Sequence, residues 1–136
     1  MARVSTFLYC DSFENIMTPS GPKLNVSNPL QIFTPAYIPG NFSFGILIGI
    51  IGFDTKITHS LRVIFKHKES EKSVFDTGNI EFPTNAESKL PTYLDGTMIN
   101  MDFRNVVFEN DGEYFTEVIF DDKKLGEFPI WATTIK

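Results

Sequence analysis

The uninterrupted apolar stretch at residues 42–53, FSFGILIGIIGF, limits the possible folds of this chain more than any other feature. It contains no charge and no proline, and Ser43 is its one polar residue. A helix that crosses a bilayer needs about 20 apolar residues, so this stretch is too short. Its glycines would each cost a helix about 1 kcal/mol relative to alanine, whereas its isoleucines and phenylalanines favour a strand. Because both faces of such a strand are apolar or bare, we predict a central strand that is covered on both sides.

Gly45 and Gly49 fall on the same face of this predicted strand and leave a strip without side chains. One interpretation is that a bulky neighbour, such as Trp131 or one of the phenylalanines, fills the strip. The other interpretation is that the strip is the floor of a groove, where a ligand or another backbone approaches. Gly45 and Gly49 are therefore candidate binding residues.

The composition favours a single all-β domain over residues 1–136. Of the 136 residues, 42% are hydrophobic, which is enough for one core, and the 14 phenylalanines favour strands. The net charge of −5 argues against a nucleic-acid partner, because phosphates attract basic surfaces. The first apolar run ends at Asp11, too early for a secretory signal, and no stretch is long enough to cross a membrane. We therefore expect a cytoplasmic protein without a membrane partner.

Short apolar alternations separated by turn residues run through the whole chain. Sustained helical periodicity is lacking, so we predict no substantial helix. About eight strands at this spacing favour a two-sheet antiparallel β-sandwich, immunoglobulin-like or jelly-roll-like, with a barrel as the alternative. In the strand at 97–108 we expect one shared face, interrupted at Asn105, for Thr97, Ile99, Met101, Phe103 and Val107. The predicted strands are 4–10, 23–33 with an interruption at Pro29, 42–53, 59–66, 73–77, 80–82, 97–108, 113–120 and 125–133.

Turn-forming residues predict the main connections. Residues 11–22 are rich in Asp, Ser, Asn, Pro and Gly and are expected to form a turn region. Asp111 and Gly112 lie between apolar alternations, which is a strong hairpin signal, so the last three strands are expected to form a meander. The longest loop, residues 83–96, is expected to be mobile or functional, because loops of this length are uncommon otherwise.

Three segments together resemble a bacterial family of small all-β proteins of unknown function. They are the opening VSTFLYCD, the middle PLQIFTPAYIPGNFSFGILIGI and the closing DGEYFTEVIFDDKKLGEFPIWA. In that family a first strand ends in an acidic residue, and a loop with proline precedes a long strand. A Gly-x-Tyr hairpin then leads to a last strand with an inward proline. The resemblance implies the sandwich fold and supplies no catalytic residues.

Residues that could carry catalysis are few and scattered. His59 and His67 bracket one predicted strand, about 26 Å apart at 3.3 Å per residue, so they cannot share a metal. We expect both to lie exposed at strand ends. Cys10, the single cysteine, falls in a predicted core strand, and no G-x-S-x-G or phosphate-binding motif is present. Acidic residues gather at 109–113 and 121–122, where turn chemistry explains them. We predict a protein that is not an enzyme and holds no metal or other cofactor, with catalysis by Cys10 as the alternative.

The apolar excess and the scarcity of catalytic groups favour a binding module of bacterial or phage origin. It would dock a protein partner, or self-associate as a homo-oligomer, through a sheet face. One alternative is a protein that sequesters a small anionic ligand, in a pocket at a subunit interface or under the 83–96 loop. Lys89, Tyr93 and Arg104 would then grip the anion. A virion or other structural component is a further alternative. Aromatic residues near strand ends are candidates for partner recognition: Tyr37, Phe42, Tyr93 and Tyr114.

Overall fold

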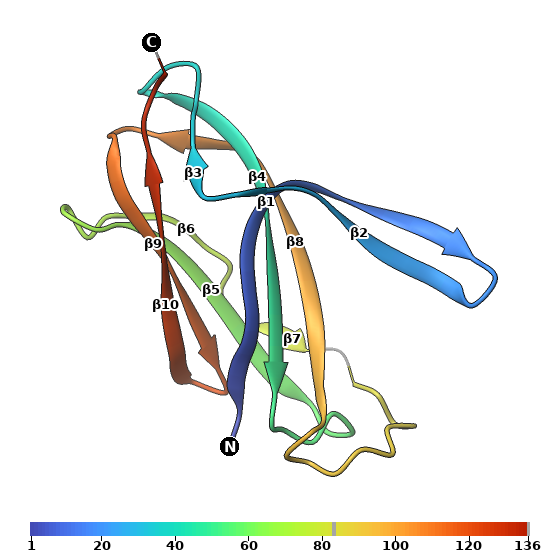
Figure 1. The fold of residues 1–136 in the computed structure, drawn as a ribbon. Coiled ribbons are helices and arrows are strands. Elements are labelled where there is room, and N and C mark those ends of the chain that lie inside the picture. Colours follow the sequence, from blue (N-terminus) through green and yellow to red (C-terminus); the bar gives the residue numbers. More distant parts are fainter. Residues whose placement is uncertain (83, 136) are drawn as a thin grey trace.

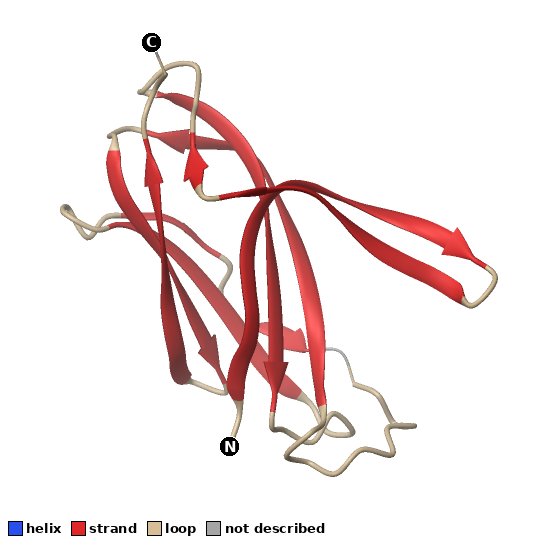
Figure 2. Cartoon of the chain, viewed as in Figure 1, coloured by secondary structure: helices blue, strands red, loops and turns tan. Residues whose placement is uncertain are grey.

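The computed structural model describes residues 1–82 and 84–135 and shows two β-sheets packed against each other (Figure 1). Every regular element in these residues is a strand, as Figure 2 shows. The two-sheet β-sandwich predicted from the sequence is therefore confirmed, with ten strands rather than about eight. The strands are β1 (Arg3–Thr18), β2 (Gly21–Leu30), β3 (Ile32–Phe33), β4 (Gly40–Ile51), β5 (His59–His67), β6 (Ser73–Asp76), β7 (Ile80–Phe82), β8 (Gly96–Phe108), β9 (Gly112–Phe120) and β10 (Lys123–Ala132).

One sheet contains four strands in the order β2-β1-β4-β8, so β4 lies in its interior as predicted. Phe44, Ile46, Ile48 and Ile50 belong to the core and are fully buried. The residues between them face away from the core and are buried as well, because neighbouring side chains cover them. The stretch 42–53 therefore has no face in water along most of its length.

The second sheet contains six strands in the order β3-β10-β9-β5-β6, and β7 pairs with the other half of β5. All of these pairs are antiparallel except that of the short β3 with β10. The hairpin predicted between β9 and β10 is present. Its turn residues Asp121 and Asp122 have φ values of 48° and 64°, which match the twist of a two-residue hairpin. Pro129 lies in the part of β10 that β3 does not pair, which is the edge position expected for it.

The predicted meander of the last three strands is wrong, because β8 and β9 belong to different sheets. Asp111 and Gly112 make a corner from one sheet to the other instead of a hairpin. Gly112 has a φ of 118°, and the Tyr114 hydroxyl donates to the Asn110 carbonyl at this corner. An Asp-Gly pair favours a reversal of the chain. It does not decide which strand β9 pairs with, because that depends on the packing of the core.

The predicted placement of Val107 on the same face as Phe103 is also wrong, because β8 contains a bulge. Arg104 and Asn105 together lie opposite Ser43 of β4. Asn105 has a φ of 55°, and its N–H donates to Ser43 Oγ at 2.9 Å. A bulge reverses the alternation of side chains beyond it, so Phe108 is buried and Val107 is exposed.

Residues 11–22 do not form the predicted turn region. β1 continues to Thr18 and the chain returns as β2 after a tight turn, so residues 11–29 form a two-stranded ribbon, called the arm below. β1 leaves β4 after Cys10, which pairs with Gly45. Figure 1 shows the arm projecting away from the sandwich on the side where β8 lies. The arm is rich in polar residues, as loops are, but the two strands satisfy their backbones by pairing with each other.

Aromatic rings and one buried hydroxyl join the two sheets. The ring of Phe44 in β4 packs against that of Phe33 in β3, with centroids 4.4 Å apart. The hydroxyl oxygen of Tyr9 in β1 lies 2.8 Å from Thr116 Oγ1 in β9. The same hydroxyl donates to the carbonyl of Phe128 in β10 at 2.6 Å. The core is therefore held by ring packing and by a hydrogen-bonded polar group at its centre.

Phe44→Ala should lower the free energy of unfolding by about 3–5 kcal/mol, because it leaves a cavity among the core rings. Urea denaturation, followed by circular dichroism, measures the loss. Tyr37→Ala is the control, since the Tyr37 side chain is 78% exposed, and it should change stability by about 0.5 kcal/mol or less. Equal stability of the two variants would contradict this description of the core.

Candidate functional site

Gly45 lies on the outer face of β4, and a phenylalanine covers it. A Cβ atom at Gly45 would lie 2.5 Å from Cε2 of Phe13 and 3.1 Å from Sγ of Cys10. Phe13 comes from the base of the arm, so one of the two interpretations of the glycine strip is confirmed here: a phenylalanine fills it. Trp131, the other suggested occupant, is in β10 of the second sheet and is 52% exposed.

Gly49 has no open space above it either. A Cβ atom there would lie 3.2 Å from the Met98 methyl group and 3.2 Å from Cβ of Thr6. The side chains of β1 and β8 thus close over β4 from both sides. The outer face of β4 therefore offers no groove floor at either glycine, and the two glycines instead let neighbouring side chains approach the backbone.

Cys10 is a residue of β1 that lies opposite Gly45 of β4, and it is fully buried. Burial raises the pKa of the Cys10 thiol, and the carboxylates of Asp102 and Asp11 raise that pKa further. A nucleophilic cysteine needs the opposite shift, because the thiolate is the reactive form. The accessibility of the Cys10 thiol instead depends on the contact of the arm with the sheet, because its sulfur and the Phe13 ring lie over the same glycine.

Phe13→Ala should raise the rate at which iodoacetamide alkylates Cys10 at least about tenfold, the effect of roughly 1.4 kcal/mol of lost local protection. Removing the ring uncovers the sulfur and releases the base of the arm. Mass spectrometry of the folded protein over time measures the rate. The control is Met17→Ala, near the tip of the arm, which should leave the rate unchanged. Equal rates in both variants would show that the arm does not protect Cys10.

Lys89, Tyr93 and Arg104 do not converge on one site. Lys89 and Tyr93 are exposed on the loop before β8, of which the structure describes residues 84–95, while Pro83 lies outside the described residues. Arg104 is eight residues along β8 from Gly96, or about 26 Å at 3.3 Å per residue. Its guanidinium lies 3.4 Å from the Asp102 carboxylate. The loop and Arg104 thus mark opposite ends of the same strand.

A buried carboxylate fixes the end of this loop. Asp95 accepts hydrogen bonds from the N–H of Thr55 at 3.1 Å and from its hydroxyl at 2.7 Å. The Ser88 hydroxyl donates to the other carboxylate oxygen at 2.8 Å, and the N–H of Gly96 at 3.0 Å. Burial raises the pKa of Asp95, but these donors outweigh it and lower the pKa to about 2. The loop is therefore anchored to the sandwich at the point where β8 begins.

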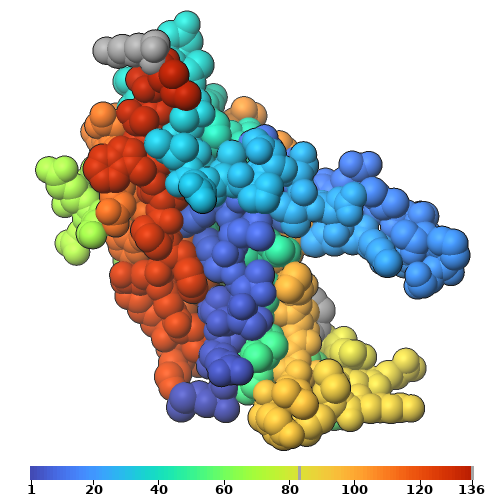
Figure 3. Space-filling view, viewed as in Figure 1, coloured from blue at the N-terminus to red at the C-terminus, as the bar shows by residue number. Residues whose placement is uncertain are grey.

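The arm, β8 and residues 84–95 form one surface, called the β8 side below. Figure 3 shows the arm and the 84–95 loop standing out on either side of a hollow bordered by β8. Exposed apolar side chains occur on all three parts. They are Ile16, Met17 and Leu24 on the arm, Met98 and Val107 on β8, and Leu90, Tyr93 and Leu94 on the loop.

Sequence reasoning missed the arm residues, although a signal for them exists. Apolar residues alternate at Phe13 and Met17 and again at Leu24 and Val26, on both sides of a Thr-Pro-Ser-Gly turn. This pattern is typical of a hairpin with one apolar face. The many turn-forming residues between them hid it.

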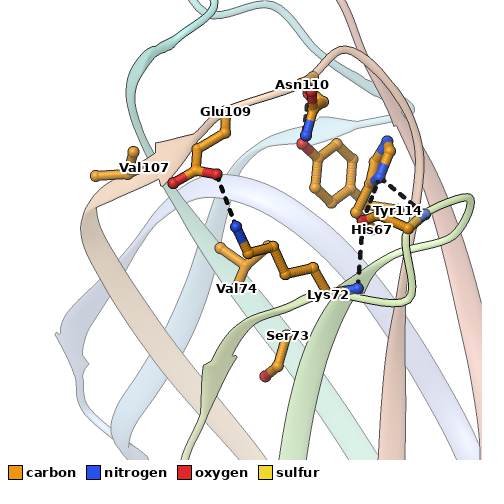
Figure 4. A pocket seen from close by; sticks show the side chains of 9 residues that line it. His67, Lys72, Ser73, Val74, Val107, Glu109, Asn110 and Tyr114 are labelled. Carbon is orange, nitrogen blue, oxygen red and sulfur yellow. Dashed lines mark hydrogen bonds and ion pairs between the residues drawn. The ribbon is translucent and has the colours of Figure 1, made fainter.

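His67 was expected to be exposed, and that expectation is wrong, because its residue exposure is only 7%. Figure 4 shows it beside Tyr114 in a pocket of about 140 Å³, lined by residues of 67–74 and 107–110. The N–H of Ser70 donates to His67 Nδ1 at 3.3 Å, and His67 Nε2 lies 3.1 Å from the carbonyl oxygen of Asp111, to which it donates. The imidazole therefore joins the turn after β5 to the corner before β9.

The pocket places a serine hydroxyl beside the imidazole. The Ser70 hydroxyl lies 2.9 Å from His67 Nδ1, but the other ring nitrogen meets a backbone carbonyl instead of a carboxylate. In a Ser-His-Asp triad an acidic group orients the histidine, whereas among the described contacts of this ring the place of that group is taken by the Asp111 carbonyl. At the mouth Lys72 and Glu109 form an ion pair at 3.2 Å. The arrangement is that of a polar brace between two turns.

His59 also departs from the expected exposure, because only 10% of its side chain is exposed. Its Nδ1 donates to the Asp121 carboxylate at 2.6 Å, and its Nε2 donates to the Asp54 carbonyl at 2.7 Å. Burial lowers the pKa of His59, but these acceptors outweigh it, so the net pKa is raised. Burial raises the pKa of Asp121, but the hydrogen bonds from His59 and from Ser60 lower it overall. The charged pair fastens the β9–β10 turn to β5.

The His59–Asp121 pair should make stability depend on pH. The raised pKa of His59 adds stability below its unfolded pKa of about 6.5, and that stability is lost as the pH rises through the folded pKa. The lowered pKa of Asp121 adds stability above about pH 3.9, and it is lost as the pH falls. Between about pH 6 and pH 8.5 the wild type should therefore lose more stability than Asp121→Asn, measured by urea denaturation. Parallel losses in both proteins would rule out this contribution.

Two features are absent from the described residues. No group of three or more His, Cys, Asp or Glu side chains in residues 1–82 and 84–135 is placed to hold a metal ion. In the same residues, no helix is long and apolar enough to cross a membrane.

The fold is that of an immunoglobulin-like domain. The chain is similar to the C-terminal domain of wzt, with a TM-score of 0.54 and 11% identity over 99% of this chain and 75% of that one. It is also similar to an immunoglobulin-like protein from Pseudomonas aeruginosa, with a TM-score of 0.50 and 13% identity over 98% of this chain and 97% of that one. Identities this low show a shared fold and nothing about activity.

Within that fold class, the chain belongs to the family of unknown function DUF6941, whose model matches residues 5–133. This match confirms the resemblance to a family of small all-β proteins without an assigned function. No curated protein matches the chain.

Proposed function

We propose that this chain is a non-enzymatic interaction module that binds a protein strand at the β8 side. The observation that carries the proposal is the arm, whose second strand pairs with β1 alone in the sheets of the described chain. An isolated two-stranded hairpin is marginally stable at best in water. The arm therefore gains stability when a partner covers its apolar face.

The arm has one apolar face, and most of it is uncovered. Side chains alternate along each strand, so every second cross-strand pair shares a face. At the base of this face, Phe13 is partly buried on Gly45. Near the tip, Met17 is 77% exposed. A partner at the β8 side would cover the tip. The pairs on this face are Phe13 with Val26, Asn15 with Leu24, and Met17 with Pro22.

The free edge of β8 supports the same proposal. Proteins protect exposed sheet edges with short strands, prolines, lysines and bulges. In the described chain β3, β6 and β7 are short, and β2 contains Pro22, Lys23 and Pro29. The segment 97–103 of β8 has none of these features, since its bulge begins at Arg104. An edge of this kind accepts an added strand through backbone hydrogen bonds.

Other functions have less support from the geometry. The fully buried Cys10, with its raised pKa, and the fully engaged His67 ring are poor catalytic groups. An anion site made by Lys89, Tyr93 and Arg104 would need side chains from opposite ends of β8. The exposed apolar residues of the arm and the 84–95 loop suit a protein partner better than a small anion.

Photo-crosslinking tests the proposal. A benzoylphenylalanine in place of Met17 or of Met98 should give covalent protein adducts when the full chain is irradiated in extract of its source cells. Both positions are exposed on the β8 side. The same residue in place of Trp131 is the control, because Trp131 is similarly exposed but lies in the other sheet. Adducts at the first two positions and not at the third are expected.

Two outcomes would overturn the proposal. One is the absence of adducts at both Met17 and Met98. The other is equal labelling at Trp131, which would mean that the β8 side has no preference for a partner.

A further inference from the structure

The inward side of the β8 edge is apolar and only partly covered. Ile99, Met101 and Phe103 are partly buried and pack against the core from the last strand of their sheet. The ring of Phe103 stacks on Phe75 of β6 in the opposite sheet, with centroids 4.1 Å apart. β6 is itself the last strand of its sheet, so the sandwich ends here with apolar side chains at its margin. An added strand beside β8 would continue the sheet and cover this margin.

From this geometry we infer that the occupant of the β8 side is a second copy of this chain, bound by antiparallel pairing of β8 with β8 across a two-fold axis. The inference rests on the proposed function and names its partner. A two-fold interface uses the same patch on both copies, so each residue of the strand must suit the residue that symmetry places opposite it. The segment 97–103 meets this requirement.

A two-fold axis at Asn100 pairs all of residues 97–103, the segment without a bulge, with the same residues of the second copy. Ile99 then lies opposite Met101 of the second copy, so apolar side chains meet on the inward face. On the outward face Asn100 meets its own counterpart, and two amides can exchange hydrogen bonds. Asp102 lies opposite Met98, which keeps the two carboxylates apart. An axis at Asp102 would bring like charges directly together, which destabilises a strand pair.

The arm fits the same arrangement. It leaves the sheet after Cys10, its Phe13 ring lies over β4, the strand beside β8, and it projects on the side of β8. A second copy paired to β8 would therefore lie beneath the arm. By symmetry the second copy would extend its own arm over the first copy. The exposed faces of both arms, with Met17 and Leu24, would then be covered in one dimer.

Two substitutions at Asn100 test the inference, since the side chain is exposed and its replacement should not disturb the fold. Asn100→Lys should weaken dimerisation at least about tenfold, because two ammonium groups would face each other across the axis. Gln31→Lys adds the same charge at an exposed position between β2 and β3, away from β8, and should leave the dimer unchanged. Analytical ultracentrifugation of the purified full chain at micromolar concentrations measures the dimer dissociation constant of the wild type and of both variants.

Asn100→Cys gives a sharper readout. Residues opposite each other on antiparallel strands have Cα atoms about 4.5–5.5 Å apart, within the range of a disulfide. Mild oxidation should therefore link two copies of this variant covalently. Gln31→Cys should stay unlinked under the same conditions. The native Cys10 is fully buried and should not react.

A monomeric wild type, or an Asn100→Cys variant that links no faster than Gln31→Cys, would overturn the inference. The crosslinking at Met17 and Met98 separates this result from failure of the proposed function. Adducts of twice the chain mass support the second copy. Adducts of another mass at the same positions would support the proposed function with a different protein as partner, and would overturn the inference that the partner is a second copy.

Discussion

Burial of β4 on both faces is the constraint on which the rest of the structure depends. Its inward phenylalanine and isoleucines form one wall of the core, where Phe44 meets Phe33 from the opposite sheet. Its outward glycines have no side chains and let β1, β8 and the arm approach the backbone. An apolar strand of this kind must sit inside a sheet with neighbours on each side, and β1 and β8 take these two places.

The contact of Phe13 with Gly45 joins this constraint to the candidate function. It anchors the base of the arm on the outer face of β4 and leaves the tip of the arm in water. The sandwich accounts for the apolar residues of its core, but it does not account for those on the arm, β8 and the 84–95 loop. Exposed apolar surface, where it is contiguous, marks a candidate interface. The hypothesis of an interaction module is thus supported by a specific surface, although the sequence had suggested a sheet face.

The errors of sequence reasoning share a physical cause. The Asp-Gly pair before β9 was interpreted as a hairpin, yet local turn preference does not say which strand the chain pairs with next. Residues 11–22 were interpreted as turns, because short polar residues suit turns and solvated strands alike. The alternation predicts Val107 on the face of Phe103, because a bulge leaves no reliable mark in the alternation that it interrupts. In each case the deciding partner is distant in sequence.

By itself, the sequence determined the all-β class, the two-sheet sandwich, the central place of 42–53 and the β9–β10 hairpin, because apolar periodicity and two-residue turn chemistry are local properties. Only the tertiary structure decided that Phe13 covers Gly45, that Lys89 and Arg104 lie at opposite ends of β8, and that the arm stands free beside an unprotected edge. These facts depend on register and on packing between distant strands, which no single segment encodes.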